Sequence, residues 1–182
     1  MKLESVSVEL IMKQRKYLFL LGMLGLLFLT GLKAKDDAPE FSGINQDGKA
    51  IHLSDFNGKF VLIFFYPKDD TPGCTKEACS FRDEYAKIKA LNSVVLGVSR
   101  QDQRSHLEFK NKHKLPFDLL VDKDGTIAQA FGVGQMPVIG LTKRQSVLIG
   151  PDRKIIQFYS DVNPENHTRE VLADIQKASQ TH

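Results

Sequence analysis

The chain has two cysteines, Cys74 and Cys79, and their spacing and surroundings suit redox chemistry. Cys74 follows Thr71, Pro72 and Gly73. Threonine is a good helix N-cap and proline fits the first helical position, so a helix is predicted to begin here. Cys74 then stands in the first turn, where unpaired backbone N–H groups and the positive end of the helix dipole favour the thiolate. Since the thiolate is the reactive form, the pattern indicates a nucleophilic cysteine.

Cys79 lies five residues further along the same predicted helix. Five helical residues advance the chain by roughly 7.5 Å, which places the two Cα atoms about 8 to 9 Å apart. A disulfide needs a separation below ~7 Å, so the cysteines can join only if the helix start unwinds. Such a pair suits a catalytic cycle better than a permanent crosslink. Two alternatives stay open, a buried apolar role for one or both cysteines and, less favoured by the spacing, a zinc site.

The elements that must position these cysteines are a buried strand and a helix. Residues 60–65 form a continuous apolar run of Phe, Val, Leu and Ile, which predicts a strand buried on both faces. After it, Ala78, Phe81, Tyr85 and Ile88 recur at helical spacing and define one apolar helix face. The cysteines therefore follow the carboxyl end of a strand, where sheets of this kind place their sites.

The rest of the chain alternates predicted strands and helices, which indicates an α/β domain with a mixed central sheet. In chain order the predicted elements are a hairpin within 41–53, a loop or helical turn at 54–59, a strand at 93–99, a helix at 103–113 with Leu107 and Phe109 facing inward, a strand at 119–121, a helix at 127–131, a glycine-rich flexible loop at 132–142, strands at 146–149 and 155–159 around a turn, and a last helix opened by Pro164.

The charge of the chain is concentrated near its start. The formal net charge is +3, but the residues before position 35 contribute five basic and only two acidic side chains, so the remaining 20 basic and 20 acidic residues balance. A neutral body argues against nucleic-acid binding, which needs a basic face. We therefore expect no nucleic-acid partner.

The N-terminal part, residues 1–34, has the layout of a signal peptide or membrane anchor. Lys13, Arg15 and Lys16 precede an apolar stretch at 17–32, which is short for a membrane-spanning helix of ~20 residues. Residues 35–182 are then the folded domain. We expect an exported protein of the periplasm or cell envelope, with an N-terminus that contacts the membrane if it is not cleaved.

With these motifs in place, the sequence resembles the peroxiredoxins, most closely the bacterioferritin-comigratory-protein or peroxiredoxin Q branch. The resemblance rests on Pro67-x-x-x-Thr71-x-x-Cys74, on the C-x4-C spacing to Cys79 and on Phe-Arg-Asp at 81–83, and it covers the chain from about residue 32 to the last helix. It implies a thioredoxin-like fold, a mixed central β-sheet flanked by helices. It also implies antioxidant reduction of hydrogen peroxide and organic hydroperoxides.

The resemblance assigns roles to five residues. Cys74 corresponds to the peroxidatic cysteine and Cys79 to the resolving one, which would form an intramolecular disulfide. Thr71 would hydrogen-bond to the thiolate and peroxide, and Pro67 would shape the pocket. Arg144, in the run Arg-Gln-Ser-Val at 144–147, would be the active-site arginine of the family.

The resemblance also implies the partners of the reaction. A thioredoxin or thioredoxin-like protein would recycle the disulfide, the chain would act as a monomer, and no metal or organic cofactor would take part. Most relatives are cytosolic, so an exported chain would need a reductant of the envelope. Five histidines (His52, His106, His113, His167 and His182) are scattered without ligand spacing and are interpreted as surface residues.

Two other functions remain as alternatives. An exported thiol-disulfide oxidoreductase would share fold and compartment, but it needs C-x-x-C and a proline before the late strand, where this chain has Arg144 and Gln145. A non-enzymatic envelope chaperone with vestigial cysteines would bind peptides, and Cys74→Ser would leave that binding unchanged.

Overall fold

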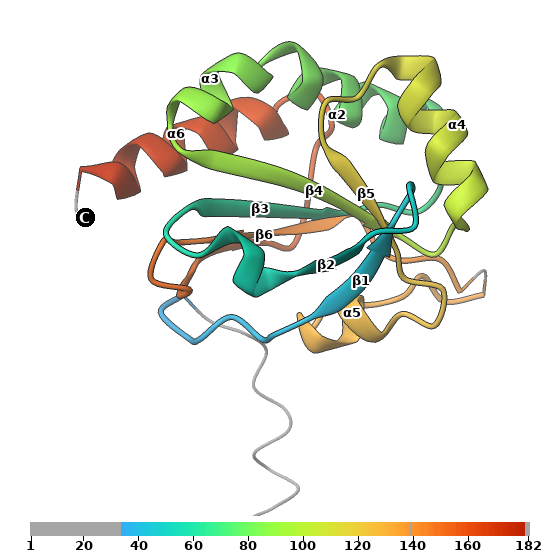
Figure 1. Cartoon of the computed structure of the whole chain (residues 1–182), viewed down its shortest axis with the longest axis horizontal. Coiled ribbons are helices and arrows are strands. Elements are labelled where there is room, and N and C mark those ends of the chain that lie inside the picture. Colours follow the sequence, from blue (N-terminus) through green and yellow to red (C-terminus); the bar gives the residue numbers. More distant parts are fainter. Residues whose placement is uncertain (1–33, 139, 181–182) are drawn as a thin grey trace, which may run out of the picture. The chain divides into compact units, whose positions relative to one another are not determined.

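The structure, a computed structural model, describes residues 34–138 and 140–180. In this part of the chain, seven strands form one mixed sheet in the order β2-β1-β5-β4-β3-β6-β7 (Figure 1). The strands are β1 (Ser42–Asn45), β2 (Ala50–His52), β3 (Phe60–Phe65), β4 (Ser93–Ser99), β5 (Asp118–Val121), β6 (Gln145–Ile149) and β7 (Ile155–Tyr159). The central strands β3, β4 and β5 are parallel, whereas β6, β7, β1 and β2 pair antiparallel to their neighbours. The predicted mixed sheet is confirmed.

Helices cover both faces of the sheet (Figure 1). The four helices α2, α3, α4 and α6 pack on one face, and α5 packs on the other with residues that precede β3. The helical elements are η1 (Leu53–Phe56), α2 (Pro72–Asp83), α3 (Tyr85–Ala90), α4 (Gln103–His113), α5 (Thr126–Ala130) and α6 (His167–Ser179). The layered arrangement is the thioredoxin-like fold that the resemblance implies.

Strand β3 joins the two cores because its side chains alternate between them. Leu62 and Phe64 belong to the core under α2, α3, α4 and α6, and Ile63 and Phe65 belong to the core under α5. All six residues of the strand are buried, which explains why its sequence is continuously apolar rather than alternating. The strand ends directly before the loop that carries the chain to Cys74.

Most elements lie where the sequence places them. The strand at 93–99 and the helix at 103–113 have the predicted bounds, and the hairpin within 41–53 forms as β1 and β2. Its turn is closed by Asn45, whose side chain accepts hydrogen bonds from the backbone N–H groups of Asp47 and Lys49. The single helical turn at 54–59 is η1.

Three details of the helices differ from the prediction. The helix after Gly73 bends at Glu84, which has φ −97° and ψ 6°, so α2 and α3 are separate although they share one apolar face. In α4 the inward residues are Phe109 and His106, and Leu107 is 38% exposed. The last helix begins at His167, one turn after Pro164. No glycine or proline marks the bend at Glu84 in the sequence.

Gly97, in the middle of β4, has no room for a side chain. A Cβ atom there would lie 2.6 Å from Leu119 Cδ2 and 2.8 Å from Phe64 Cζ, both in the closely packed core. We expect Gly97→Ala to lower the free energy of unfolding by about 1 to 3 kcal/mol through overpacking. Urea denaturation measures this as a lower midpoint with an unchanged slope. Gly134→Ala is the control, because its Cβ would meet only the flexible side chain of Lys143, and an equal loss in both variants would contradict the packing argument.

The predicted signal peptide or anchor, residues 1–34, falls almost entirely outside the described residues. Within the described ranges, no helix is both long and apolar enough to cross a membrane. Residues 35–138 and 140–180 belong to the predicted folded domain.

Candidate active site

Cys74 is the third residue of α2 and is 1% exposed. The helix begins as predicted, with Thr71 as N-cap in extended conformation (φ −84°, ψ 149°) and Pro72 in the first turn. Backbone N–H groups in the first turn have no acceptor within the helix and remain available as hydrogen-bond donors. The positive end of the helix dipole lies at the same place, beside the sulfur. The Cys74 sulfur therefore lies at the donor end of α2, as the sequence predicts.

Arg144 directly precedes β6 and contacts the sulfur of Cys74. Because β6 runs antiparallel to β3, with Gln145 opposite Phe65, the residue before β6 lies next to the carboxyl end of β3. The Arg144 Nη2 atom donates a hydrogen bond to Cys74 Sγ at 3.2 Å. A Cβ atom on Gly73 would lie 3.1 Å from the same Nη2, so glycine leaves space for the guanidinium. Arg144, which the resemblance assigns to the site, thus lies at the Cys74 sulfur.

Glu77 is a site residue that the sequence reasoning missed. Its side chain is fully buried, and its Oε2 accepts a short hydrogen bond from Arg144 Nη1. The guanidinium therefore bridges a carboxylate and the Cys74 sulfur. Burial alone would lower the pKa of Arg144, but the adjacent Glu77 carboxylate and Cys74 sulfur outweigh it and raise that pKa. The sequence did hold a signal, since Glu77 is a charged residue on the apolar face that carries Cys74 and Phe81.

Burial also raises the pKa of Glu77 to about 7, although Arg144 opposes the shift. The other oxygen, Oε1, has no hydrogen-bond partner and lies 4.0 Å from His167 Nε2. Burial, followed by repulsion from Arg144, lowers the pKa of His167 to about 4. His167 Nε2 also lies 2.9 Å from the hydroxyl of Ser146. The neutral imidazole of His167 and the carboxyl group of Glu77, which titrates near neutral pH, thus lie close to each other, and Glu77 connects them to Arg144.

These two pKa shifts act on stability in opposite directions. Glu77 binds its proton more tightly in the folded state, so its contribution to stability is present below pH 4.5 and is lost as the pH rises to about 7. His167 binds its proton less tightly in the folded state, so its contribution is present above pH 6.5 and is lost as the pH falls to about 4. Between pH 4.5 and 6.5 the two effects cancel.

Substituting Glu77 or His167 should therefore make the pH dependence that the other residue gives to stability measurable. Relative to the wild-type curve, the free energy of unfolding of Glu77→Gln should rise by up to about 3 kcal/mol between pH 4.5 and 6.5, because only His167 then acts. The curve of His167→Gln should fall by a similar amount over the same range. Urea denaturation at closely spaced pH values measures both. Parallel curves for all three proteins would contradict the assigned shifts.

Thr71 and Pro67 lie in the loop between β3 and α2. The hydroxyl of Thr71 donates to the carbonyl of Lys68 at 3.1 Å rather than capping α2. Pro67 is partly buried. No hydrogen bond is found between Thr71 and the Cys74 sulfur, so the role of Thr71 toward a bound peroxide stays a prediction.

A buried polar network fixes this loop. Tyr66 donates its hydroxyl to Asp69 Oδ1 at 2.7 Å, and Ser105 donates to Asp69 Oδ2 at 2.7 Å. His106 Nδ1 lies 2.9 Å from the same Oδ2, and His106 Nε2 lies 3.2 Å from the carbonyl of Leu120. Because Asp69 is bonded to both the loop and α4, the network holds the turn that delivers the chain to Cys74.

Two histidines predicted at the surface are buried. His106 and His167 are 0% exposed, and polar partners inside the protein meet both ring nitrogens of His106 and Nε2 of His167, which favours their burial. His113 is only partly exposed, with 18% of its side chain accessible. His52 is exposed as predicted, and His182 lies outside the described residues.

Cys79 is free and partly buried, and it lies in α2 together with Cys74. Both cysteines are therefore reduced in an unbroken helix, as the spacing predicts. The polar contact of the Cys79 sulfur is not with the Cys74 site. Its Sγ lies 3.9 Å from Nδ1 of His113, the last residue of α4.

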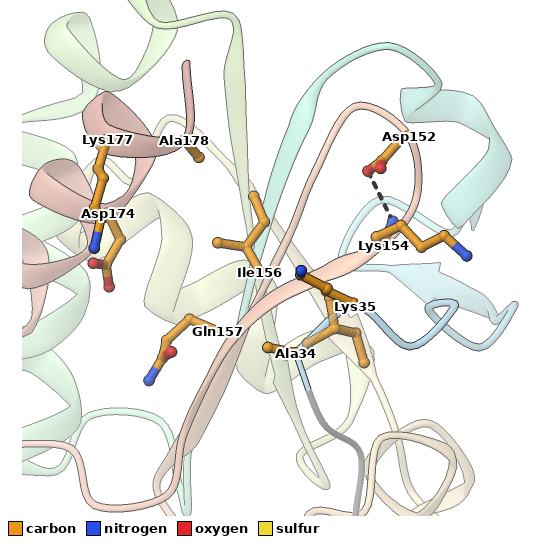
Figure 2. A pocket seen from close by; sticks show the side chains of 10 residues that line it. Ala34, Lys35, Asp152, Lys154, Ile156, Gln157, Asp174, Lys177 and Ala178 are labelled. Atoms are coloured by element: carbon orange, nitrogen blue, oxygen red, sulfur yellow. Dashed lines mark hydrogen bonds between the residues drawn. The ribbon is translucent and has the colours of Figure 1, made fainter. Parts of the chain in front are cut away.

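A pocket of about 530 Å³ lies elsewhere, between β7, α6 and the first described residues (Figure 2). Among its lining residues are Ile156 and Gln157 of β7, Asp174 and Lys177 of α6, and Lys35. Neither cysteine lines it, so it is no part of the thiol site. In the described ranges, no group of three or more His, Cys, Asp or Glu side chains could hold a metal ion.

Comparison with known proteins places this fold and thiol site in a family. The sequence profile of the AhpC/TSA family matches residues 34–158, so the chain belongs to this family. Its relatives there are peroxiredoxins of the Q or Bcp type. It is 38% identical over 149 residues to peroxiredoxin Bcp of Bacillus subtilis, which covers 79% of this chain and 94% of that protein.

Plant relatives are similar but longer. The chain is 42% identical over 140 residues to the chloroplastic peroxiredoxin Q of rice (Oryza sativa subsp. japonica), which covers 76% of this chain and 64% of that protein. The chain thus spans slightly less than two thirds of the length of the rice protein.

Solved structures show the same fold. The peroxidoxin BcpB of Mycobacterium tuberculosis matches with a TM-score of 0.75 and 32% identity, covering 80% of this chain and 97% of that chain. A mutant of PrxQ from Xylella fastidiosa matches with a TM-score of 0.76 and 26% identity, covering 82% of this chain and 99% of that chain. The expected fold and family are both confirmed.

Proposed function

We propose that the chain is a thiol-dependent peroxidase that reduces hydrogen peroxide and organic hydroperoxides. The observation that carries the proposal is the hydrogen bond of 3.2 Å from Arg144 Nη2 to the buried sulfur of Cys74, at the start of a helix. A guanidinium and helix N–H groups at one sulfur favour a thiolate and also provide donors for a second anion. Membership of a peroxiredoxin family supports the same conclusion.

The reaction follows from this geometry. The Cys74 thiolate attacks one peroxide oxygen, the O–O bond breaks, and the other oxygen leaves as hydroxide or alkoxide, which takes a proton from solvent. The sulfur is oxidised to sulfenic acid and the peroxide is reduced to water or alcohol. Negative charge moves from sulfur to oxygen, so fixed donors beside that path stabilise the transition state more than the ground state. Arg144 and the N–H groups at the start of α2 are such donors.

We assign the second half of the cycle to Cys79. Its thiol condenses with the Cys74 sulfenic acid, which forms a disulfide and releases water. An external dithiol, a thioredoxin or thioredoxin-like protein, then reduces the disulfide by exchange. Because both cysteines lie in one helix, the cycle needs no second copy of the chain, which supports action as a monomer.

The alternative functions are less well supported. A thiol-disulfide oxidoreductase does not require an arginine at its nucleophilic sulfur, and the C-x4-C spacing differs from its motif. A peptide-binding chaperone leaves the arrangement of Cys74, Arg144 and Glu77 without a purpose. The family to which the chain belongs also favours the peroxidase.

We further propose that the protein is exported to the periplasm or cell envelope. The support is the basic and then apolar sequence of residues 1–34, which is typical of a signal peptide or anchor. Fractionation of cells that produce the tagged chain, with and without residues 1–34, tests this. Recovery of both forms in the cytosol would overturn the proposal.

Intact mass of the purified chain tests the peroxidase function. One equivalent of hydrogen peroxide should remove two hydrogens from the wild-type chain within seconds, the mark of an intramolecular disulfide. In Cys79→Ser the same treatment should add one oxygen, on Cys74. Two thiols that do not react with peroxide would contradict the function.

A further inference from the structure

Cys79 ends a line of three side chains that come from separate segments. Its Sγ lies 3.9 Å from His113 Nδ1, within the limit for a hydrogen bond to sulfur. On the other side of the ring, His113 Nε2 lies 2.8 Å from Oδ1 of Asp70. Asp70 belongs to the loop before α2, Cys79 to α2 and His113 to the end of α4. These hydrogen bonds join the three side chains to one another and not to Arg144 or Glu77, so this group is separate from the Arg144–Cys74 pair.

The partners of His113 define which ring nitrogen carries the proton. A carboxylate can only accept, so Asp70 accepts a hydrogen bond from Nε2–H, and the lone pair of Nδ1 then faces the Cys79 thiol. The hydrogen bond from His113 is also the main reason why the pKa of Asp70 is lowered, so the carboxylate stays charged at neutral pH. The imidazole is therefore oriented to accept the proton of Cys79.

Other charged groups around His113 agree with this role. Lys112 Nζ lies 3.0 Å from Asp70 Oδ1 and helps to hold the carboxylate. Arg82, on α2, donates to the carbonyl of His113 at 2.8 Å, and its pKa is raised mainly by the hydrogen bond to Asp83 and also by Cys79. The ring of Phe109 packs edge-on against the His113 ring, with centroids 5.1 Å apart. Arg82 thus places a positive charge near the Cys79 sulfur.

We propose that His113, oriented by Asp70, is the base that deprotonates Cys79 for disulfide formation. The proposal rests on the peroxidase function above. In the resolving step, the proton of Cys79 moves to His113 Nδ1, and the thiolate forms a bond to the Cys74 sulfur. The S–O bond of the sulfenic acid breaks, and the oxygen leaves as hydroxide and takes up a proton to become water. Cys79 is oxidised, the Cys74 sulfur is reduced, and His113 returns its proton to solvent.

The proton is taken while α2 is intact, because the contact between Cys79 and His113 exists in the folded helix. The start of the helix then opens and brings the two sulfurs within bonding distance. Oxidation of Cys74 and formation of the disulfide are therefore two successive steps, and peroxide experiments can measure the rate of each. His113 affects the second rate, disulfide formation, and leaves the first rate, oxidation of Cys74, unchanged.

Single-turnover kinetics tests the proposal on the full chain. His113→Gln should leave the rate of Cys74 oxidation unchanged but slow disulfide formation on the order of 10²-fold at neutral pH, the usual contribution of a general base. The deficit should shrink as the pH rises, because solvent then deprotonates Cys79. A structural defect would slow the step by the same factor at every pH. Asp70→Asn should act in the same direction, and in the double variant the two losses should not add.

A second measurement does not depend on peroxide. In the Cys74→Ser chain, iodoacetamide reports the thiolate of Cys79 directly, and adding His113→Gln should slow alkylation about tenfold or more at neutral pH. Glu108→Gln is the matched control, because Glu108 lies on the same helix α4 in an exposed ion pair with Arg104, and it should alkylate within about twofold of its parent. Equal alkylation with and without His113 would overturn the proposal. If peroxide fails to oxidise Cys74 in the wild type, the peroxidase function fails, while the alkylation rates still decide the role of His113.

Discussion

Replacing Cys74 with serine is expected to reduce peroxide turnover on the order of 10⁴-fold or more, to the level of the uncatalysed reaction. A serine hydroxyl keeps its proton at neutral pH, so Arg144 and the start of α2 would face a neutral group instead of a thiolate. Cys79 cannot replace it, because its sulfur contacts His113 on α4 rather than the guanidinium. Consumption of hydrogen peroxide with dithiothreitol as the reductant measures the loss.

Cys79→Ser is the matched control for this prediction. It changes the same atom in the same helix but leaves Cys74 and Arg144 in contact, so one oxidation of Cys74 per chain should proceed at the wild-type rate. Equal thermal stability of both variants would show that the loss in Cys74→Ser is chemical. Retained turnover in Cys74→Ser would remove this cysteine from the reaction and turn attention to the peptide-binding alternative.

The strand and helices that carry this site could be predicted from the sequence, because the residues that define them are close together along the chain. The apolar run of β3, the helix start at Thr71 and Pro72, and the bounds of α4 each depend on neighbours along the chain. Arg144 was placed by the resemblance to the peroxiredoxins, whose arginine precedes a late strand, and β6 does pair with β3. Periodicity and turn residues were sufficient for these elements.

The parts that were missed depend on contacts between distant segments. Glu77 is charged in a position that periodicity assigns to the core, and only Arg144, 67 residues away, explains its burial. His106 is buried in place of Leu107 because Asp69 and a carbonyl of β5 satisfy its ring. His167 is buried next to Ser146 for the same reason. A polar residue whose partner lies far along the chain gives no local pattern.

Replacing Arg144 with alanine is expected to slow the reaction of Cys74 with peroxide by about 10²- to 10³-fold, the usual cost of removing a donor that stabilises the transition state. The variant loses the charge beside the sulfur and, in the proposed mechanism, the donor to the leaving oxygen. Stopped-flow measurement of Cys74 oxidation gives the second-order rate constant. Arg104→Ala is the control, because Arg104 lies on the surface in an exposed ion pair with Glu108, and its rate should not change.

The same substitution has a separate effect on stability that must be distinguished from the chemistry. Without Arg144, the buried carboxyl group of Glu77 takes up a proton at neutral pH because burial raises its pKa, and it loses its hydrogen-bond partner, which costs about 1 to 3 kcal/mol. Adding Glu77→Met replaces the unpaired polar group with an apolar side chain and should restore most of that stability. It should not restore the rate, because the guanidinium that contacts Cys74 is still missing. A double variant that regains both would show that Arg144 acts only by holding the fold, whereas recovery of stability alone assigns the guanidinium to the reaction itself.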